Sequence, residues 1–216
     1  SAIFTTSIAL TTPAQKPRGL SRKTFFAGPR LAEKGLRGIE AIAHDYSKGG
    51  CATLFGMLKW LVAECAAEVR LRLTASPAGL RAIDFDLSRP AEGAPAPENA
   101  ILREASRQLC AYFDGSLRVF TIPLDMRGTE FQLRVWRQLE TIPYGRTCSY
   151  TQVAEAIGAA RAVRAVGAAN GANPIPIVVP CHRVIGASGK LVGYGGGLPL
   201  KKRLLALEGA TSMNLV

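Results

Sequence analysis

The sequence lacks several features that would define its class at once. It has no apolar run of the roughly 18 residues that a membrane-spanning helix needs, so a transmembrane protein is not expected. Its five cysteines are odd in number and include no Cys-x-x-Cys pair, which argues against a disulfide scaffold. Charged residues make up only 20% against 48% apolar residues, so a wholly disordered chain is also excluded. The 216 residues suffice for one large domain or two small ones.

Acidic residues are scarce at both ends of the chain. Residues 1–60 carry 9 Lys/Arg and 3 Asp/Glu (net +6), residues 61–126 carry 7 and 9 (net −2), and residues 127–216 carry 11 and 4 (net +7). A mildly acidic middle beside a basic final third indicates two units with different partners. The basic unit is a candidate for polyanion binding, nucleic acid first, although a merely basic surface gives the same charge.

Residues 1–60 form an extension of unclear role. No acid precedes Arg30, and the basic and hydroxyl residues there are typical of an organelle transit peptide, a disordered basic tail or sequence upstream of the true start. A helical pattern over residues 35–60 is broken by two glycines. His44 and Cys51 are interpreted as structural residues, because no Cys-x-x-Cys pair accompanies them.

Residues 61–124 are predicted to form a small α/β companion domain. Apolar and polar residues alternate over 69–74, which predicts a strand. A second strand over 80–85 follows a Ser-Pro-Ala-Gly turn, so the two form a hairpin. Residues 89–98 are a proline-rich loop, and apolar spacing over 99–113 predicts a helix.

Residues 125–212 are predicted to form a second, mainly helical domain. Thr129 is expected to cap a helix whose buried face carries Phe131, Val135, Trp136 and Leu139. Short helices over 150–157 and 160–169, joined by a glycine turn, indicate a helix-turn-helix. Ordinary helix–helix packing explains the same pattern.

The segment with most chemical content is Asn173-Pro-Ile-Pro-Ile-Val-Val-Pro-Cys-His-Arg-Val184. The apolar run before Pro180 predicts a buried strand that delivers Cys181 to its end, beside an imidazole and a guanidinium. Nearby cations favour the reactive thiolate, and histidine is the natural base near neutral pH. Because neighbours in a strand point to opposite faces, Cys181 and His182 can cooperate only if the backbone turns at Pro180.

This segment resembles the active-site signature of the O6-alkylguanine-DNA alkyltransferases, also called methylated-DNA–protein-cysteine methyltransferases. The likeness extends over about residues 125–210, and more weakly over the companion domain. It rests on Pro180-Cys-His-Arg-Val184 and on four further stretches, Gly145-Arg-Thr-Cys-Ser-Tyr-Thr-Gln-Val-Ala154, Arg161-Ala-Val-Arg-Ala-Val-Gly167, Gly193-Tyr-Gly-Gly-Gly197 and 201–208. It implies an α/β N-terminal domain followed by a mainly α C-terminal domain with a winged-helix-like helix-turn-helix.

The resemblance implies a DNA repair enzyme that acts once. Cys181 would take the alkyl group of O6-alkylguanine, and of O4-alkylthymine, irreversibly. His182 would act as base through a water molecule, Glu208 would orient His182, and Asn173 would be a hinge. A thiolate suits attack on an alkyl carbon, and the thioether product has no ready leaving group.

The family's DNA contacts carry over residue by residue. Tyr150 would help to rotate the 3′ phosphate and donate a proton to the departing base, and Arg164 would be the arginine finger that replaces the flipped nucleotide. The second helix would enter the minor groove with little sequence preference. The remaining DNA-binding candidates are Arg161, Ala165 and Ala169, and those of the alkyl and base pocket are Pro176, Val184, Tyr194, Gly195 and Gly196.

The resemblance implies no cofactor. No zinc is predicted, although some family members bind it, because His44 and Cys51 lie outside the matched region and Cys65 and Cys110 lack a His partner. The partner would be double-stranded DNA with an alkylated base, bound by a monomer without a membrane. The compartment would be the bacterial cytoplasm at the nucleoid, or a eukaryotic nucleus or organelle. Two alternatives stay open: a lesion-binding module that no longer transfers, and, more remotely, a thiol protease, for which no separate oxyanion or Asn partner is apparent.

Overall fold

The computed structural model describes residues 57–66 and 69–210, which all fall within one compact unit of the chain. His44, Cys51 and the basic extension up to residue 56 lie outside the described residues, as do residues 211 and 212 of the predicted second domain. Lys59 and Trp60 belong to a strand, so the helical pattern predicted over 35–60 is wrong at its end. The strand begins two residues before the predicted domain boundary, and the domain ranges stay a prediction.

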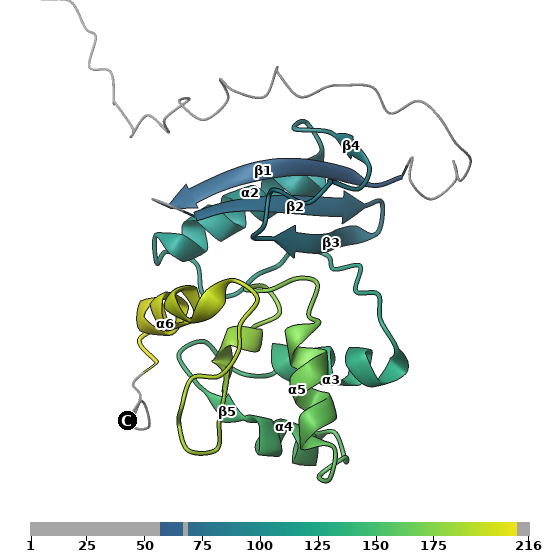
Figure 1. The fold of residues 1–216 in the computed structure, drawn as a ribbon. Helices are drawn as coiled ribbons and strands as arrows, with labels where there is room; N and C mark the ends of the chain where they lie inside the picture. Colours follow the sequence, from purple (N-terminus) through teal and green to yellow (C-terminus); the bar gives the residue numbers. More distant parts are fainter. Residues whose placement is uncertain (1–56, 67–68, 211–216) are drawn as a thin grey trace, which may run out of the picture. The chain divides into compact units, whose positions relative to one another are not determined.

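The first half of the described chain is a four-stranded sheet in the order β3-β2-β1-β4 (Figure 1). The strands are β1 (Lys59–Ala66), β2 (Val69–Ser76), β3 (Gly79–Asp84) and β4 (Ala94–Pro95). The predicted hairpin is confirmed, because β2 and β3 pair antiparallel with Leu73 opposite Ile83. β4 lies in the segment that was predicted to be a loop, and it pairs with β1 in parallel.

Helix α2 (Ala100–Phe113) packs against this sheet and confirms the predicted helix. The Asn99 side chain caps its first turn by accepting a hydrogen bond from the Leu102 amide. Its buried face contains Leu102, Leu109 and Tyr112, each fully buried. Leu109 and Tyr112 are three positions apart and therefore share one helix face. Tyr112, in the last turn, reaches beyond the sheet to the functional site described below.

Backbone hydrogen bonds join the sheet to the second half of the chain. The Leu80 amide donates to the Pro123 carbonyl at 2.8 Å, and the Ile83 amide donates to the Pro174 carbonyl at 2.9 Å. Gly79 has a positive φ and lies so close to Pro123 that a Cβ atom would be 2.4 Å from its carbonyl oxygen. A residue with a side chain would therefore disturb this connection.

The second half is built on helices α3 (Glu130–Glu140), α4 (Tyr150–Ala156) and α5 (Val163–Gly171) (Figure 1). Capping boxes start α3 and α4, with Thr129 and Ser149 as N-caps. The indole of Trp136 donates to the Ala169 carbonyl at 2.8 Å and so ties α3 to α5. The third helix begins at Val163 rather than at residue 160, so Arg161 lies in the turn before it.

Two short strands and a 3₁₀ turn lie next to one another around Cys181. Strands β5 (Cys148–Ser149) and β6 (Val184–Ile185) pair in parallel, and a 3₁₀ turn, η2 (Cys181–Arg183), precedes β6. Helix α6 (Gly197–Leu207) ends at Glu208, its C-cap residue. Within the described ranges no helix is long and apolar enough to cross a membrane.

Candidate functional site

The segment before the cysteine is a tight buried turn rather than the predicted strand. The Val179 amide donates to the Ile175 carbonyl at 2.9 Å, which closes a loop of five residues. Ile177, at its centre, is fully buried and has φ of 75°, a conformation that costs a β-branched residue about 1–3 kcal/mol. The expectation of a strand failed because Pro176 and Pro180 lack amide hydrogens for a ladder.

Asn173 holds both ends of this turn. Its Nδ2 donates to the Val179 carbonyl at 2.8 Å, and its Oδ1 accepts from the Ile175 amide at 3.0 Å. A side-chain amide whose oxygen and nitrogen are both hydrogen-bonded fixes the local backbone geometry. The side chain thus fastens the strained turn immediately before Cys181.

The backbone turns at Pro180, as the sequence predicted. The Cys181 amide donates to the Val179 carbonyl at 2.8 Å, and Pro180 has φ −81° and ψ 61°, an inverse γ-turn. Cys181, His182 and Arg183 then form the 3₁₀ turn. With about three residues per turn, successive side chains point about 120° apart. Cys181 and His182 therefore face different directions although they are neighbours in the chain.

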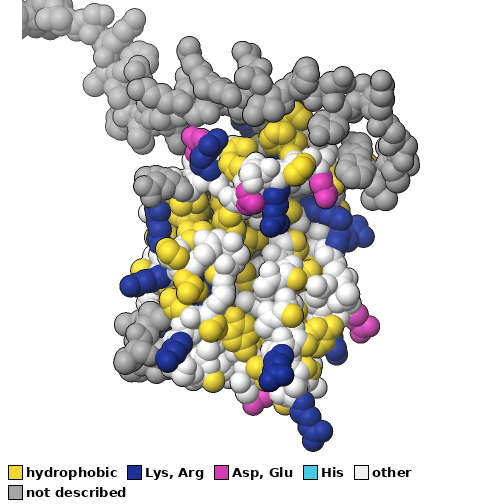
Figure 2. Space-filling model, viewed as in Figure 1, with side chains coloured by type: hydrophobic (Ala, Val, Ile, Leu, Met, Phe, Trp, Pro, Cys, Tyr) yellow, Lys and Arg dark blue, Asp and Glu magenta, His cyan; other side chains and the backbone are white. Residues whose placement is uncertain are grey.

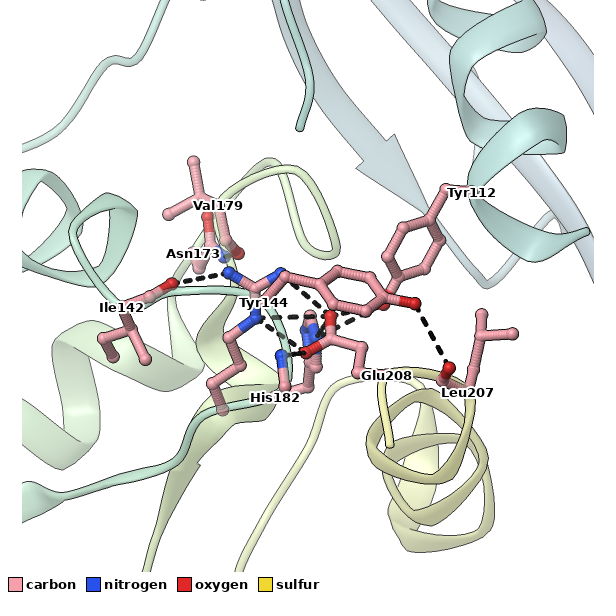
Figure 3. Close-up of polar contacts among 10 residues, drawn as sticks. Tyr112, Ile142, Tyr144, Asn173, Val179, His182, Leu207 and Glu208 are labelled. Carbon is pink, nitrogen blue, oxygen red and sulfur yellow. Dashed lines mark hydrogen bonds and ion pairs between the residues drawn. The ribbon is translucent and has the colours of Figure 1, made fainter. Parts of the chain in front are cut away.

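His182 and Glu208 form a buried hydrogen-bonded pair (Figure 3). His182 is fully buried, and its Nε2 lies 2.9 Å from Glu208 Oε1. A carboxylate accepts only, so Nε2 carries the hydrogen and Nδ1 has a free lone pair. Nδ1 is buried and has no hydrogen-bond partner among the described residues. Burial lowers the pKa of His182 although Glu208 acts to raise it, which favours the neutral imidazole.

Besides His182, three further residues donate hydrogen bonds to Glu208. Tyr112 Oη donates to Oε1 at 2.7 Å, Arg183 donates from Nε to Oε2 at 2.9 Å and from Nη2 to Oε1 at 2.8 Å, and the Gly145 amide donates to Oε2 at 3.1 Å. Burial acts to raise the pKa of Glu208, but the hydrogen bonds from His182 and Arg183 lower it to about 2. The carboxylate is therefore ionised and fixed throughout the physiological range.

Cys181 lies in a nearly closed position. It is only 5% exposed, and burial raises the pKa of its thiol, while a hydrogen bond from Asn173 and the charge of Lys201 act to lower it. Lys201 is fully buried, and its Nζ donates to the carbonyls of Val184 and Val192 at 2.7 and 2.8 Å. Burial lowers the pKa of Lys201 to about 8. This cation thus links the Cys181 segment to the glycine loop.

The β5–β6 pairing brings Tyr150 to the same place. Ser149 lies opposite Ile185, so Tyr150, the first residue of α4, lies close to the segment that follows Cys181. Burial raises the pKa of Tyr150, the charge of Cys181 raises it further, and a hydrogen bond with Asn170 acts to lower it. The phenol therefore remains a proton donor at neutral pH.

The predicted DNA-contacting residues differ in their exposure to solvent. Arg161, Arg164 and Ala165 are exposed, and Figure 2 shows Lys and Arg side chains on the surface in the lower part of the view, where α4 and α5 lie. Ala169 is only 3% exposed and packs in the core, so its side chain does not reach this surface, and its part in DNA binding stays a prediction. Helical spacing explains the difference, since Ala165 points about 100° away from buried Val166 around α5, whereas Ala169 follows Val166 at three positions and shares its face.

The predicted pocket residues lie in two groups. Pro176 and Val184 are buried, whereas Tyr194, Gly195 and Gly196 belong to the glycine loop before α6. A Cβ atom on Gly195 would meet open space, but one on Gly196 would lie 2.7 Å from Leu200 and 3.1 Å from the Tyr194 ring.

Tyr194 connects this loop to the rest of the site. Its ring centroid lies 6.4 Å from that of His182 and 5.7 Å from that of Phe85, which follows β3 in the companion domain. The loop therefore packs between the histidine and the sheet.

Sequence reasoning missed three members of this site. Tyr112 appeared as a core residue of α2, Lys201 as part of a matched stretch, and Arg183 as a neighbouring cation without a partner. Arg183 carried a signal, because a basic residue beside a buried motif needs a carboxylate. Tyr112 and Lys201 had no such signal in the sequence, because contacts between distant segments bring both residues to the site.

Across residues 57–66 and 69–210, no group of three or more His, Cys, Asp and Glu residues is placed to hold a metal ion. The four described cysteines are all free thiols.

Two family models match the described chain. Residues 130–210 match the DNA binding domain of 6-O-methylguanine DNA methyltransferase, and residues 70–126 match its ribonuclease-like domain. Together they account for most of the described residues, and they divide the chain between the sheet with α2 and the helical half.

Named relatives agree with these models. A methylated-DNA–protein-cysteine methyltransferase of Mycolicibacterium paratuberculosis is 70% identical over 104 residues, 48% of this chain and 63% of its own length, a little under two thirds. One from Mycobacterium leprae is 63% identical over 112 residues, 52% of this chain and 68% of its own. The crystal structure of Mycobacterium tuberculosis O6-methylguanine methyltransferase superposes with a TM-score of 0.64 at 46% identity, covering 72% of this chain and 95% of that one. The chain therefore belongs to the methylated-DNA–protein-cysteine methyltransferase family.

Proposed function

We propose that this protein repairs DNA by moving the alkyl group of O6-alkylguanine, and of O4-alkylthymine, to Cys181. The observation that carries the proposal is a buried cysteine directly before a neutral histidine whose far side is fixed by an ionised carboxylate. This is the order nucleophile, base and orienting group that activates a thiol. Family membership supplies the substrate.

His182 accepts the thiol proton through a water molecule. The Nδ1 lone pair is the acceptor, because Nε2 is committed to Glu208. The thiolate then attacks the alkyl carbon, so that a sulfur–carbon bond forms while the bond from carbon to guanine O6 breaks. The electron pair stays on the base, which takes a proton. Tyr150 is the proposed donor of that proton, and its raised pKa keeps it protonated until then.

Asn173 and Lys201 support the thiolate without reacting. Asn173 fastens the turn and donates to the sulfur, and Lys201 supplies positive charge near it. Both favour the charged form of a buried thiol, which burial alone disfavours. The product is a thioether without a leaving group, so one molecule of protein repairs one lesion.

The helices α4 and α5 are the proposed helix-turn-helix. A solved relative, the alkyltransferase OGT of Mycobacterium tuberculosis, is known in complex with DNA, with a TM-score of 0.63 at 46% identity, covering 71% of this chain and 92% of that one. Here α5 would lie in the minor groove, where exposed Ala165 allows close approach and Arg164 fills the space of the flipped nucleotide. Arg161, in the turn before α5, would contact phosphate. We propose little sequence preference and a monomeric complex.

Incubation with a duplex that contains labelled O6-methylguanine tests the reaction. Label retained on the wild-type protein at Cys181, identified by peptide mass spectrometry and absent from Cys181→Ala, supports transfer. The half-buried Cys110 gives a matched variant, Cys110→Ala, which should retain the label. Tight lesion binding without label on the wild type would favour a binding module instead.

A further inference from the structure

Tyr112 joins the companion domain to the proposed acid–base pair. It comes from the last turn of α2, 70 residues before His182 in the chain, and it is fully buried. Its hydroxyl donates to Glu208 Oε1 at 2.7 Å and lies 3.5 Å from His182 Nε2 (Figure 3). A tyrosine that served only to fill the core would not need its hydroxyl at this oxygen.

We propose that Tyr112 is a positioning residue for alkyl transfer, which acts through Glu208 to hold the ring of His182 and to limit its affinity for a proton. The inference rests on the proposed function. It assigns the companion domain a part in the chemistry, because α2 supplies a group that the helical half lacks.

One oxygen of Glu208 accepts hydrogen bonds from several donors. Glu208 Oε1 accepts from Tyr112, from His182 and from Arg183. Each additional donor withdraws negative charge from the oxygen, so less remains to stabilise an imidazolium. Burial and the charge of Glu208 raise the pKa of Tyr112, so the phenol stays a donor at every relevant pH.

All groups that face His182 enter this balance. Glu208 raises the proton affinity of the ring, whereas Arg183 and Lys201 lower it. Cys181 precedes it in the turn, and Tyr194 lies edge-on to its ring. Replacing Tyr112 by Phe removes only the hydroxyl, which donates to Oε1 and lies near Nε2, and keeps a ring that also packs on Phe113 and Phe120.

The sign of the effect follows from this arrangement. Without the Tyr112 hydroxyl, Oε1 stabilises the imidazolium better, so the pKa of His182 rises. A base with a higher pKa remains protonated to higher pH, which moves the acidic limb of the transfer rate upward. We expect a displacement of about half a unit to one pH unit, and hence transfer about three- to tenfold slower below the limb.

Tyr144→Phe is the matched control. The Tyr144 ring lies edge-on to Tyr112, with centroids 6.1 Å apart, and its hydroxyl donates to the Leu207 carbonyl at 3.1 Å. The variant therefore loses one tyrosine hydroxyl and one hydrogen bond in the same neighbourhood, but none to the carboxylate. Its pH profile should superimpose on that of the wild type.

Two measurements on the full chain test the proposal. One is the single-turnover rate of methyl transfer from pH 5 to 9 for the wild type, Tyr112→Phe and Tyr144→Phe. The other is the titration of ¹⁵N-labelled histidine by NMR. The chain has only two histidines, so a His44→Gln background isolates His182. Melting temperature and affinity for unmodified duplex report on folding and DNA binding.

An upward displacement of both the rate limb and the His182 titration in Tyr112→Phe alone supports the proposal. A rate loss that is equal at every pH, with an unmoved titration, would show a structural role and overturn it, as would a profile identical to that of the wild type. The NMR titration does not depend on transfer. A displaced His182 titration in a protein whose Cys181 takes no label would therefore contradict the proposed function but still support the coupling of Tyr112 to His182.

Discussion

Replacing Glu208 by Gln should remove a large part of the stability of this protein. The Glu208 side chain is fully buried, and the pKa of its carboxyl lies at about 2 instead of the ordinary 4.5. That difference, taken at about 1.4 kcal/mol for each pKa unit, corresponds to about 3 kcal/mol of folding free energy at neutral pH. This free energy agrees with the roughly 3–5 kcal/mol expected when one partner of a buried ion pair is removed, here the partner of Arg183.

The dependence on pH distinguishes this origin from a packing defect. A depressed pKa contributes stability that is fully present above pH 4.5 and is lost as the pH falls through 2. About half of the difference between wild type and Glu208→Gln should remain at pH 3. Urea unfolding of both proteins at pH 7, 4.5 and 3 measures it.

Glu155→Gln is the matched control, because Glu155 is an exposed residue of α4 and the chemical change is the same. Its unfolding free energy should stay within about 0.5 kcal/mol of the wild type at all three pH values. Alkyl transfer by Glu208→Gln should also fall about a hundredfold, since the base loses its orienting carboxylate. A Glu208→Gln protein as stable as the wild type at pH 7 would refute the reasoning, and so would an equal deficit at pH 7 and pH 3.

Three further outcomes follow from the site. Asn173→Ala should lower the unfolding free energy by about 1–3 kcal/mol, measured in urea, because it leaves the Ile175 amide without its acceptor and removes one of the two donors to the Val179 carbonyl; an unchanged value would contradict the role of Asn173 in holding the strained turn. Arg164→Ala should slow transfer from duplex DNA but leave the reaction with free O6-benzylguanine unchanged, and equal losses on both would contradict the finger. Gly196→Ala should slow transfer of a benzyl group more than Gly195→Ala does, since only the former meets Leu200 and Tyr194; equal rates would contradict it.

The sequence predicted the parts of this fold that depend on local patterns. The β2–β3 hairpin follows from alternating residues and a turn, and α2 and α3 follow from apolar spacing behind Asn99 and Thr129. The start of α5 was predicted three residues too early, because alanine-rich residues 160–162 have high helix propensity but form the turn.

The segment before Cys181 shows the opposite case. Four apolar residues in a row are typical of a buried strand, yet here they form a compact turn around Ile177. Two prolines remove ladder donors, and the side chain of Asn173 supplies the hydrogen bonds that a neighbouring strand would otherwise provide. The hydrophobic pattern predicted burial correctly and conformation wrongly, because a buried turn and a buried strand need the same side chains.

The 3₁₀ turn decides how the cysteine and histidine work together. In a strand the two side chains would point to opposite faces, and in the observed turn they diverge by about 120°. His182 is thus directed to Glu208 and Tyr112, on segments 26 and 70 residues away, and only its second nitrogen is left for the thiol. The motif supplies the proposed nucleophile and the proposed base as neighbours, but the arrangement that would let them cooperate is set by residues that only the folded chain brings together.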